Sequence, residues 1–298
     1  MSDSVSPRSI VVPTDTGELA ARHWGTGPRV ALALHGITAN AMSWHAVGRR
    51  LPPEWSLVAI DQRGRGGSHA LPGPFGIDQL ARDARDAVRA TGAELVVGHS
   101  MGAYVALALA DQHPGTVERL VLVDGGLPLP VPEGLDDDRL DAVLDAIVGP
   151  MLARLGVHHR DLESYVEIFR AHPAMGPWWN DDLDVYARAD ARALPEGGVV
   201  AAASPDAVRA AGRELIVRGE EIAEALGRLI VPVDLVLAER GMTDGPEPML
   251  PAEVVDRSIA LHPIMRARRV PDTNHYTVLV GEEGAQAVAE SIVRGTSI

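Results

Sequence analysis

The sequence contains neither cysteine nor lysine, and each absence removes a class of chemistry. Without cysteine there is no disulfide, no thiolate metal site and no cysteine nucleophile. All 27 basic residues are arginine. A Schiff-base lysine, a pyridoxal phosphate anchor, a serine–lysine dyad and a P-loop lysine are therefore excluded as well.

Long apolar runs and basic stripes are also missing. No stretch approaches the roughly 18 apolar residues that a membrane-spanning helix needs. The start, MSDSVSPRSIVVPTDTGELA, lacks the apolar segment of a secretory signal, so a cytoplasmic location is the expectation. The net charge of -14 at pH 7 repels phosphate groups. We therefore expect neither nucleic acid nor a membrane surface as a partner.

The 298 residues, with 46% hydrophobic and 23% charged side chains, have the composition of an ordinary globular protein. In the first 125 residues, short apolar runs alternate with longer amphipathic ones. This pattern is typical of a parallel sheet with helices on its faces. Strands are predicted at 9–13, 19–24, 29–35, 57–61, 94–98 and 119–124, and helices at 43–51, 77–91 and 101–112.

The rhythm of strands stops near residue 127 and resumes near residue 230. Between these points, segments 136–156, 159–172 and 204–227 have helical caps and apolar stripes, and no strand is predicted. Strands at 231–239 and 265–271 and a final helix at 284–293 follow. We therefore predict an α/β fold whose central sheet is mostly parallel and flanked by helices. Residues 1–126 and 230–298 form its core domain, and residues 127–229 form a helical cap, or lid, subdomain.

The segment LVVGHSMGAYVALALA, residues 95–110, places a serine between a strand-like and a helix-like apolar run. Gly98, Ser100 and Gly102 fit the pattern G-x-S-x-G at a strand-to-helix turn. There the serine adopts a strained backbone that projects its hydroxyl above the sheet, and the two glycines relieve the crowding. The amides at the start of the following helix point toward any negative charge that forms nearby. Ser100 is therefore the candidate nucleophile.

Two further motifs accompany this turn: an HG pair in LALHGIT at 32–38, and DQRGRGGS at 61–68. Together with the serine turn, they resemble the α/β-hydrolase family, over roughly residues 8–126 and 230–298. DQRGRGGS is similar to the D-x-R-G-x-G-x-S turn of many members. The resemblance implies an α/β-hydrolase fold in which a serine, an acid and a histidine form a catalytic triad.

The resemblance also assigns roles to particular residues. In the family, backbone N–H groups of the residue after the HG pair and of the residue after the nucleophile form the oxyanion hole. These residues are Ile37 and Met101 here, and their side chains need not be polar because the backbone is the donor. The catalytic histidine of the family lies between the last strand and the last helix, where PDTNHYTVLV places His275.

Three positions are candidates for the acid of the triad. Most members carry an aspartate just after the strand that reads VDLVLAE here, but Gly241 stands at that position. Asp244 lies three residues further, and Glu239 lies closer to the strand end. Some branches of the family instead use an acid at the end of the strand after the nucleophile helix, which is Asp124 here. Because the usual position is vacant, Asp124 is preferred. Each candidate keeps the chain order serine, acid, histidine.

These residues predict a serine hydrolase that cleaves a carboxylic ester or lactone of a hydrophobic small molecule through an acyl-enzyme. The cap would roof the pocket, and Trp178 and Trp179 would contact the substrate or pack the cap onto the core. No ligand cluster for a metal is visible, so neither a metal nor an organic cofactor is expected. A homodimer is compatible with this class, although no residue argues for it.

Two alternatives remain beside this prediction. The first is a carbon–carbon bond hydrolase or cofactor-free lyase on the same triad, and the second is a non-catalytic ligand-binding protein. Haloalkane dehalogenases and epoxide hydrolases of the family are excluded, because they need an aspartate where Ser100 stands.

Overall fold

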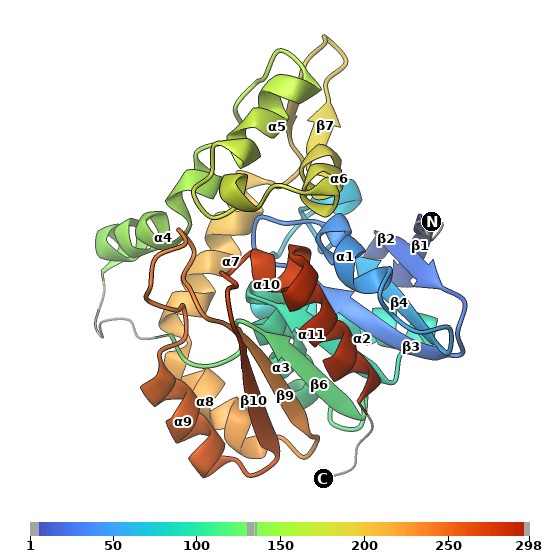
Figure 1. The fold of residues 1–298 in the computed structure, drawn as a ribbon, viewed down its shortest axis with the longest axis vertical. Coiled ribbons are helices and arrows are strands. Elements are labelled where there is room, and N and C mark those ends of the chain that lie inside the picture. Colours follow the sequence, from blue (N-terminus) through green and yellow to red (C-terminus); the bar gives the residue numbers. More distant parts are fainter. Residues whose placement is uncertain (1–5, 130–133, 135, 295–298) are drawn as a thin grey trace.

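The computed structural model describes residues 6–129, 134 and 136–294 (Figure 1). Its centre is an eight-stranded sheet with the order β1-β2-β4-β3-β5-β6-β9-β10. The strands are Arg8–Thr14 (β1), Gly17–Gly25 (β2), Arg29–Leu34 (β3), Trp55–Ile60 (β4), Leu95–His99 (β5), Arg119–Val123 (β6), Val233–Ala238 (β9) and Met265–Val270 (β10). The pairs β1–β2 and β2–β4 are antiparallel and all other pairs are parallel. The predicted mostly parallel sheet is confirmed.

Helices cover both faces of this sheet (Figure 1). They are α1 (His45–Gly48), α2 (Ile77–Thr91), α3 (Met101–Gln112), α8 (Gly219–Arg228), α9 (Ala252–Leu261), α10 (Thr277–Val280) and α11 (Glu282–Val293). In β3, Leu32 and Leu34 belong to the apolar cluster that includes α2, α3 and α8. Ala31 and Ala33 belong to the cluster that includes α1 and α11. Because both faces are covered, the central strands are continuous apolar runs.

Between β6 and β9 the chain forms the insertion that the change of rhythm predicts. Its elements are α4 (Asp137–Leu152), α5 (Leu162–Arg170), the 3₁₀ turn η3 (Gly176–Trp178), α6 (Asp181–Ala189), β7 (Ala191–Ala193), β8 (Val199–Ala201), α7 (Pro205–Val217) and α8. Figure 1 shows α4, α5, α6 and β7 beyond one end of the central strands, within the range predicted to form the cap.

The insertion contains strands, and the prediction that it has none is wrong. β7 and β8 pair as a small antiparallel hairpin. Each strand has three residues, which is too short for an alternating pattern to show in the sequence. The turn between them uses Gly197 and Gly198 at φ values of 96° and 78°, a region that glycine adopts without strain.

Two predicted helices also differ in the structure. The segment 204–227 forms two helices, α7 and α8, separated at Arg218. α8 packs against α3 beside the sheet, so the predicted cap range 127–229 includes one helix that is not over the strand ends (Figure 1). The predicted helix 43–51 is instead the 3₁₀ turn η1 (Ala41–Trp44) followed by the short α1. It begins early because the Asn40 side chain accepts a hydrogen bond from the Met42 amide.

Among the helices of the described residues, none is both long enough and apolar enough to span a membrane.

Candidate active site

Ser100 lies in the sharp turn between β5 and α3, with φ 52° and ψ -122°. This backbone conformation is strained for a residue with a side chain, and such strain is typical of functional sites. Crowding explains the two glycines. A Cβ atom at Gly98 would lie 2.2 Å from the Gly102 carbonyl oxygen, and one at Gly102 would lie 2.1 Å from the Leu34 carbonyl oxygen. The turn can therefore form only if both positions lack a side chain.

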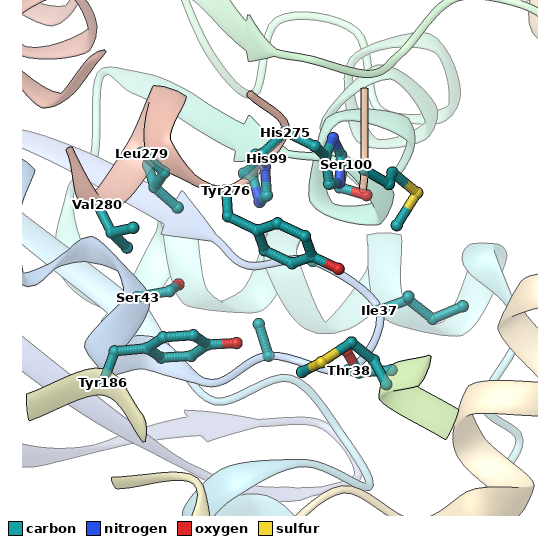
Figure 2. Close-up of a pocket in the computed structure, with 14 residues that line it drawn as sticks. Ile37, Thr38, Ser43, His99, Ser100, Tyr186, His275, Tyr276, Leu279 and Val280 are labelled. Atoms are coloured by element: carbon teal, nitrogen blue, oxygen red, sulfur yellow. Dashed lines mark hydrogen bonds between the residues drawn. The ribbon is translucent and has the colours of Figure 1, made fainter. Parts of the chain in front are cut away.

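His275 lies between β10 and α10, and the structure brings it to Ser100. Figure 2 shows its imidazole ring beside the Ser100 hydroxyl. Nδ1 of His275 is 2.7 Å from a carboxylate oxygen of Asp124. Since a carboxylate accepts, Nδ1 carries the proton and donates it, which leaves Nε2 as the basic nitrogen. Both side chains are almost completely buried.

Asp124 follows β6 directly and has a positive φ of 44°. Its second carboxylate oxygen accepts a hydrogen bond of 3.2 Å from the Ala238 amide at the end of β9. The carboxylate is thus held from two sides, by His275 and by the neighbouring strand.

The other two candidate acids lie elsewhere in the hydrogen-bond network. Asp244 accepts hydrogen bonds of 2.9 Å from the Asn274 amide group and 2.8 Å from Arg240. Burial raises the pKa of Asp244, but these hydrogen bonds outweigh it and the pKa lies below its ordinary value. Glu239 accepts a hydrogen bond from the Asp272 amide. Of the three candidates, the structure therefore places only Asp124 against the His275 ring.

Ile37 and Met101 flank the serine as the resemblance implies. Ile37 lies in the loop after β3, and Met101 is the first residue of α3, where backbone amides have no partner within the helix. In the described part of the chain, neither amide donates to an acceptor. The two N–H groups are available to an oxygen that gains negative charge when Ser100 attacks.

Arg65 is a further residue of this region that sequence reasoning missed. It is completely buried and donates to the carbonyl oxygens of Ile37, Arg63 and Ala207. Its guanidinium also lies 3.6 Å from the Met101 sulfur. No carboxylate of the described residues pairs with it, and burial lowers the pKa of Arg65 to about 9. An uncompensated positive charge thus lies beside both residues of the predicted oxyanion hole. Its only sequence signal is an arginine at a variable position of DQRGRGGS.

His99, next to the nucleophile, stays neutral. Its Nε2 donates a 2.9 Å hydrogen bond to the His275 carbonyl oxygen. Burial, together with the nearby His275, lowers the pKa of His99 to about 3. The hydrogen bond fixes the backbone of His275, so the ring of His99 acts as a support for the base.

Two cavities meet at Ser100. The hydroxyl-lined cavity has about 490 Å³ of space not occupied by atoms, part of it open to solvent, and it is lined by His275 and, besides Ser100, by the hydroxyl side chains of Thr38, Ser43, Tyr186 and Tyr276. The aliphatic cavity has about 400 Å³ of such space and is lined mainly by Leu129, Leu144, Leu215, Ile216 and Met249. Ile37, Ser100 and Met242 belong to both. The described lining residues of both cavities include no arginine, aspartate or glutamate.

The two tryptophans of the cap line neither cavity. The Trp178 indole donates a 3.4 Å hydrogen bond to Asp244, and the Arg240 guanidinium lies 5.0 Å from its ring centre. Trp179 packs against the apolar cluster on the α11 face and lies under Arg170. These contacts join the cap to the core, which is one of the two roles expected for the pair, and the substrate contact stays a prediction.

Within residues 6–129, 134 and 136–294, no group of three or more histidine, aspartate or glutamate side chains is arranged to hold a metal ion.

The fold and the serine turn define the class of protein. The chain matches the family model described as alpha/beta hydrolase fold over residues 32–191, more than half of its length. It belongs to the α/β-hydrolase family, which confirms the resemblance found in the sequence.

Individual relatives match less than half of this chain. Lipase LipV of Mycobacterium tuberculosis is 34% identical over 128 residues, which are 43% of this chain and 46% of the lipase. The 2-(acetamidomethylene)succinate hydrolase of Mesorhizobium japonicum is 32% identical over 127 residues, which are 41% of this chain and 45% of the hydrolase. In these sequence matches the chain spans about a third to a half of the relatives' own length.

Among solved structures, an E-2-(acetamidomethylene)succinate hydrolase superposes with a TM-score of 0.78, 22% identity and coverage of 96% of this chain and 99% of the other. This likeness shows the fold.

Proposed function

We propose that this protein is a serine hydrolase that cleaves the carboxylic ester or lactone of a neutral, hydrophobic small molecule. The observation that carries the proposal is the 2.7 Å contact between His275 and Asp124 beside a serine in a strained turn. The named lipase among the relatives supports ester chemistry.

The geometry supports the following steps. Nε2 of His275 accepts the Ser100 proton as Oγ forms a bond to the substrate carbonyl carbon, and the amides of Ile37 and Met101 stabilise the oxyanion. The bond to the leaving oxygen then breaks, and His275 gives that oxygen its proton. A water molecule, activated by the same histidine, cleaves the acyl-enzyme. Asp124 holds the ring in the required tautomer throughout.

The lining of the two cavities favours a neutral substrate. The hydrolase whose solved structure has a similar fold acts, by its name, on a succinate, and succinates carry carboxylates. Recognition of carboxylates ordinarily uses arginine, and the described cavity residues include none. A neutral ester or lactone therefore fits the cavities better than a dicarboxylate does.

Labelling and turnover on one preparation test the proposal. We expect a fluorophosphonate probe to label the protein and 4-nitrophenyl esters of graded chain length to be hydrolysed, with Ser100→Ala as the control that abolishes both. Absence of both labelling and turnover in the unmodified protein would overturn the proposal. Labelling with turnover of a diketone but of no ester or lactone would favour the carbon–carbon hydrolase.

A further inference from the structure

The hydroxyl-lined cavity contains two phenol groups, those of Tyr186 and Tyr276, that are available to hydrogen-bond a ligand. In the described residues, neither the Tyr186 nor the Tyr276 hydroxyl has a hydrogen-bond partner, whereas the other buried phenols do: Tyr104 donates to the Leu127 carbonyl oxygen and Tyr165 to Asp190. The Tyr186 and Tyr276 oxygens are not sealed in the interior, so they reach the open space of the cavity.

The two phenol hydroxyls face the same loop. Figure 2 shows both phenol rings pointing toward the loop that carries Ile37 and Thr38, with the Thr38 hydroxyl close by. Burial raises the pKa of Tyr276 to about 12 and raises that of Tyr186 further, so both phenols stay protonated and can donate at any physiological pH. Because unpaired polar groups in a buried site are costly, this cluster indicates a ligand oxygen.

The position of His275 indicates which half of an ester would lie in the hydroxyl-lined cavity. During acylation, His275 must protonate the alcohol oxygen as it leaves, so the alcohol half must lie on the side of His275. His275 lines the hydroxyl-lined cavity, and the aliphatic cavity on the other side of Ser100 does not include it. The acyl chain is then left to the aliphatic cavity, where the Tyr104 hydroxyl is already occupied.

We propose that the alcohol half of the substrate carries a free hydroxyl, as in an ester of a diol or other polyol, and that Tyr186 and Tyr276 select it. This inference rests on the proposed function. A hydroxyl suits the cluster because it both donates to and accepts from phenols. The described lining residues supply no ionic partner for a carboxylate or an ammonium group.

Two esters of equal size test the inference: 2-hydroxyethyl hexanoate and propyl hexanoate, which differ by one hydroxyl in place of a methyl group. We expect the unmodified protein to have the higher kcat/KM for the hydroxyethyl ester. Tyr276→Phe and Tyr186→Phe should each lower this preference about 3- to 10-fold, the effect of one lost hydrogen bond. Tyr104→Phe is the matched control, for which the ratio of the two kcat/KM values should not change.

Binding to Ser100→Ala, measured by calorimetry, provides a readout that does not need turnover. The hydroxyethyl ester should bind more tightly than the propyl ester, and adding Tyr276→Phe should remove the difference. Thermal unfolding of each variant reports whether it is folded. Equal binding of the two esters, or a preference that both Phe variants retain, overturns the inference even if Ser100 hydrolyses both esters. Failure of the unmodified protein to hydrolyse either ester counts against the proposed function, and the binding comparison then decides the inference separately.

Discussion

Asp124 and Asp244 show that the assignment of the triad acid depends on which of two adjacent residues, Asn274 or His275, a carboxylate contacts. Both follow strands at the same edge of the sheet, and both have a positive φ, 44° and 64°. Asp124 meets the His275 ring, whereas Asp244 meets the side chain of Asn274, the preceding residue. The sequence contains both carboxylates at plausible positions, but it does not show which of two adjacent side chains each one reaches.

Replacement of these acids should have unequal effects on turnover. Asp124→Asn removes the acceptor that fixes the tautomer of His275, so we expect kcat to fall by roughly 10³- to 10⁴-fold. Asp244→Asn, the matched control, keeps the shape of a side chain that does not touch the ring, and we expect a loss of less than about tenfold. Steady-state kinetics on an aryl ester measure both. A larger loss for Asp244→Asn would move the acid role to Asp244.

Arg65 is a residue whose environment the sequence does not reveal. Buried charges are usually paired with an opposite charge, and the neighbouring Arg63 follows that rule with Asp83 at 2.8 Å. Arg65 instead meets three backbone carbonyls, one of which belongs to Ala207 in the cap. The motif DQRGRGGS marks the turn in the sequence, but only the folded chain shows that Arg65 lies between the cap and the predicted oxyanion hole.

At the scale of elements, the best predicted segments carry their own boundary signals. α2 and α3 have the predicted bounds, 77–91 and 101–112. α2 ends at Gly92 in the left-handed conformation, and the serine turn precedes α3. The β7–β8 hairpin has a turn signal in Gly197 and Gly198, but its strands have only three residues each, too few for an alternating pattern to show, and they pack against α5 and α6.

The serine turn should tolerate no side chain at its second glycine. Gly102→Ala places a methyl group 2.1 Å from the Leu34 carbonyl oxygen, so β3 and α3 must separate. We expect a loss of about 3 kcal/mol in stability, seen as a lower melting temperature, together with loss of activity.

Gly219→Ala is the control for this substitution. Gly219 begins α8, and a Cβ atom there meets no other atom within 4 Å. Alanine is also the better helix former, so the melting temperature should stay the same or rise slightly. An unchanged melting temperature in Gly102→Ala would show that the turn is less crowded than the distances indicate.

For the whole molecule, the alternation of apolar runs was enough to predict the sheet, the flanking helices and the insertion. The cavities were not predictable from the sequence. Met242, Met249 and Tyr186 come from loops and a cap helix far from the motifs, and no local pattern shows that they meet at Ser100. Trp178 and Trp179 are of a residue type that often lines pockets, but they line neither cavity at Ser100. Their contacts are instead with Asp244 and Arg170.

The overall charge makes a separate prediction. The chain carries a net charge of -14, which repels anionic substrates and is screened by salt. We expect kcat/KM for an anionic ester, mono-4-nitrophenyl succinate, to rise several-fold between about 10 mM and 500 mM salt. The value for neutral 4-nitrophenyl butyrate should change less than about twofold. Faster turnover of the anionic ester at low salt would contradict the proposed neutral substrate.

The meeting of two cavities at Ser100 has a consequence for the fate of the acyl group. In the proposed mechanism, departure of the alcohol empties the hydroxyl-lined cavity while the acyl chain still fills the aliphatic one. The attacking water then enters a space shaped for alcohols, next to His275. Any small diol present can occupy the same space and compete with water as the acceptor. If the proposed mechanism holds, we expect the acyl-enzyme to partition between hydrolysis and transesterification according to the concentration of diol.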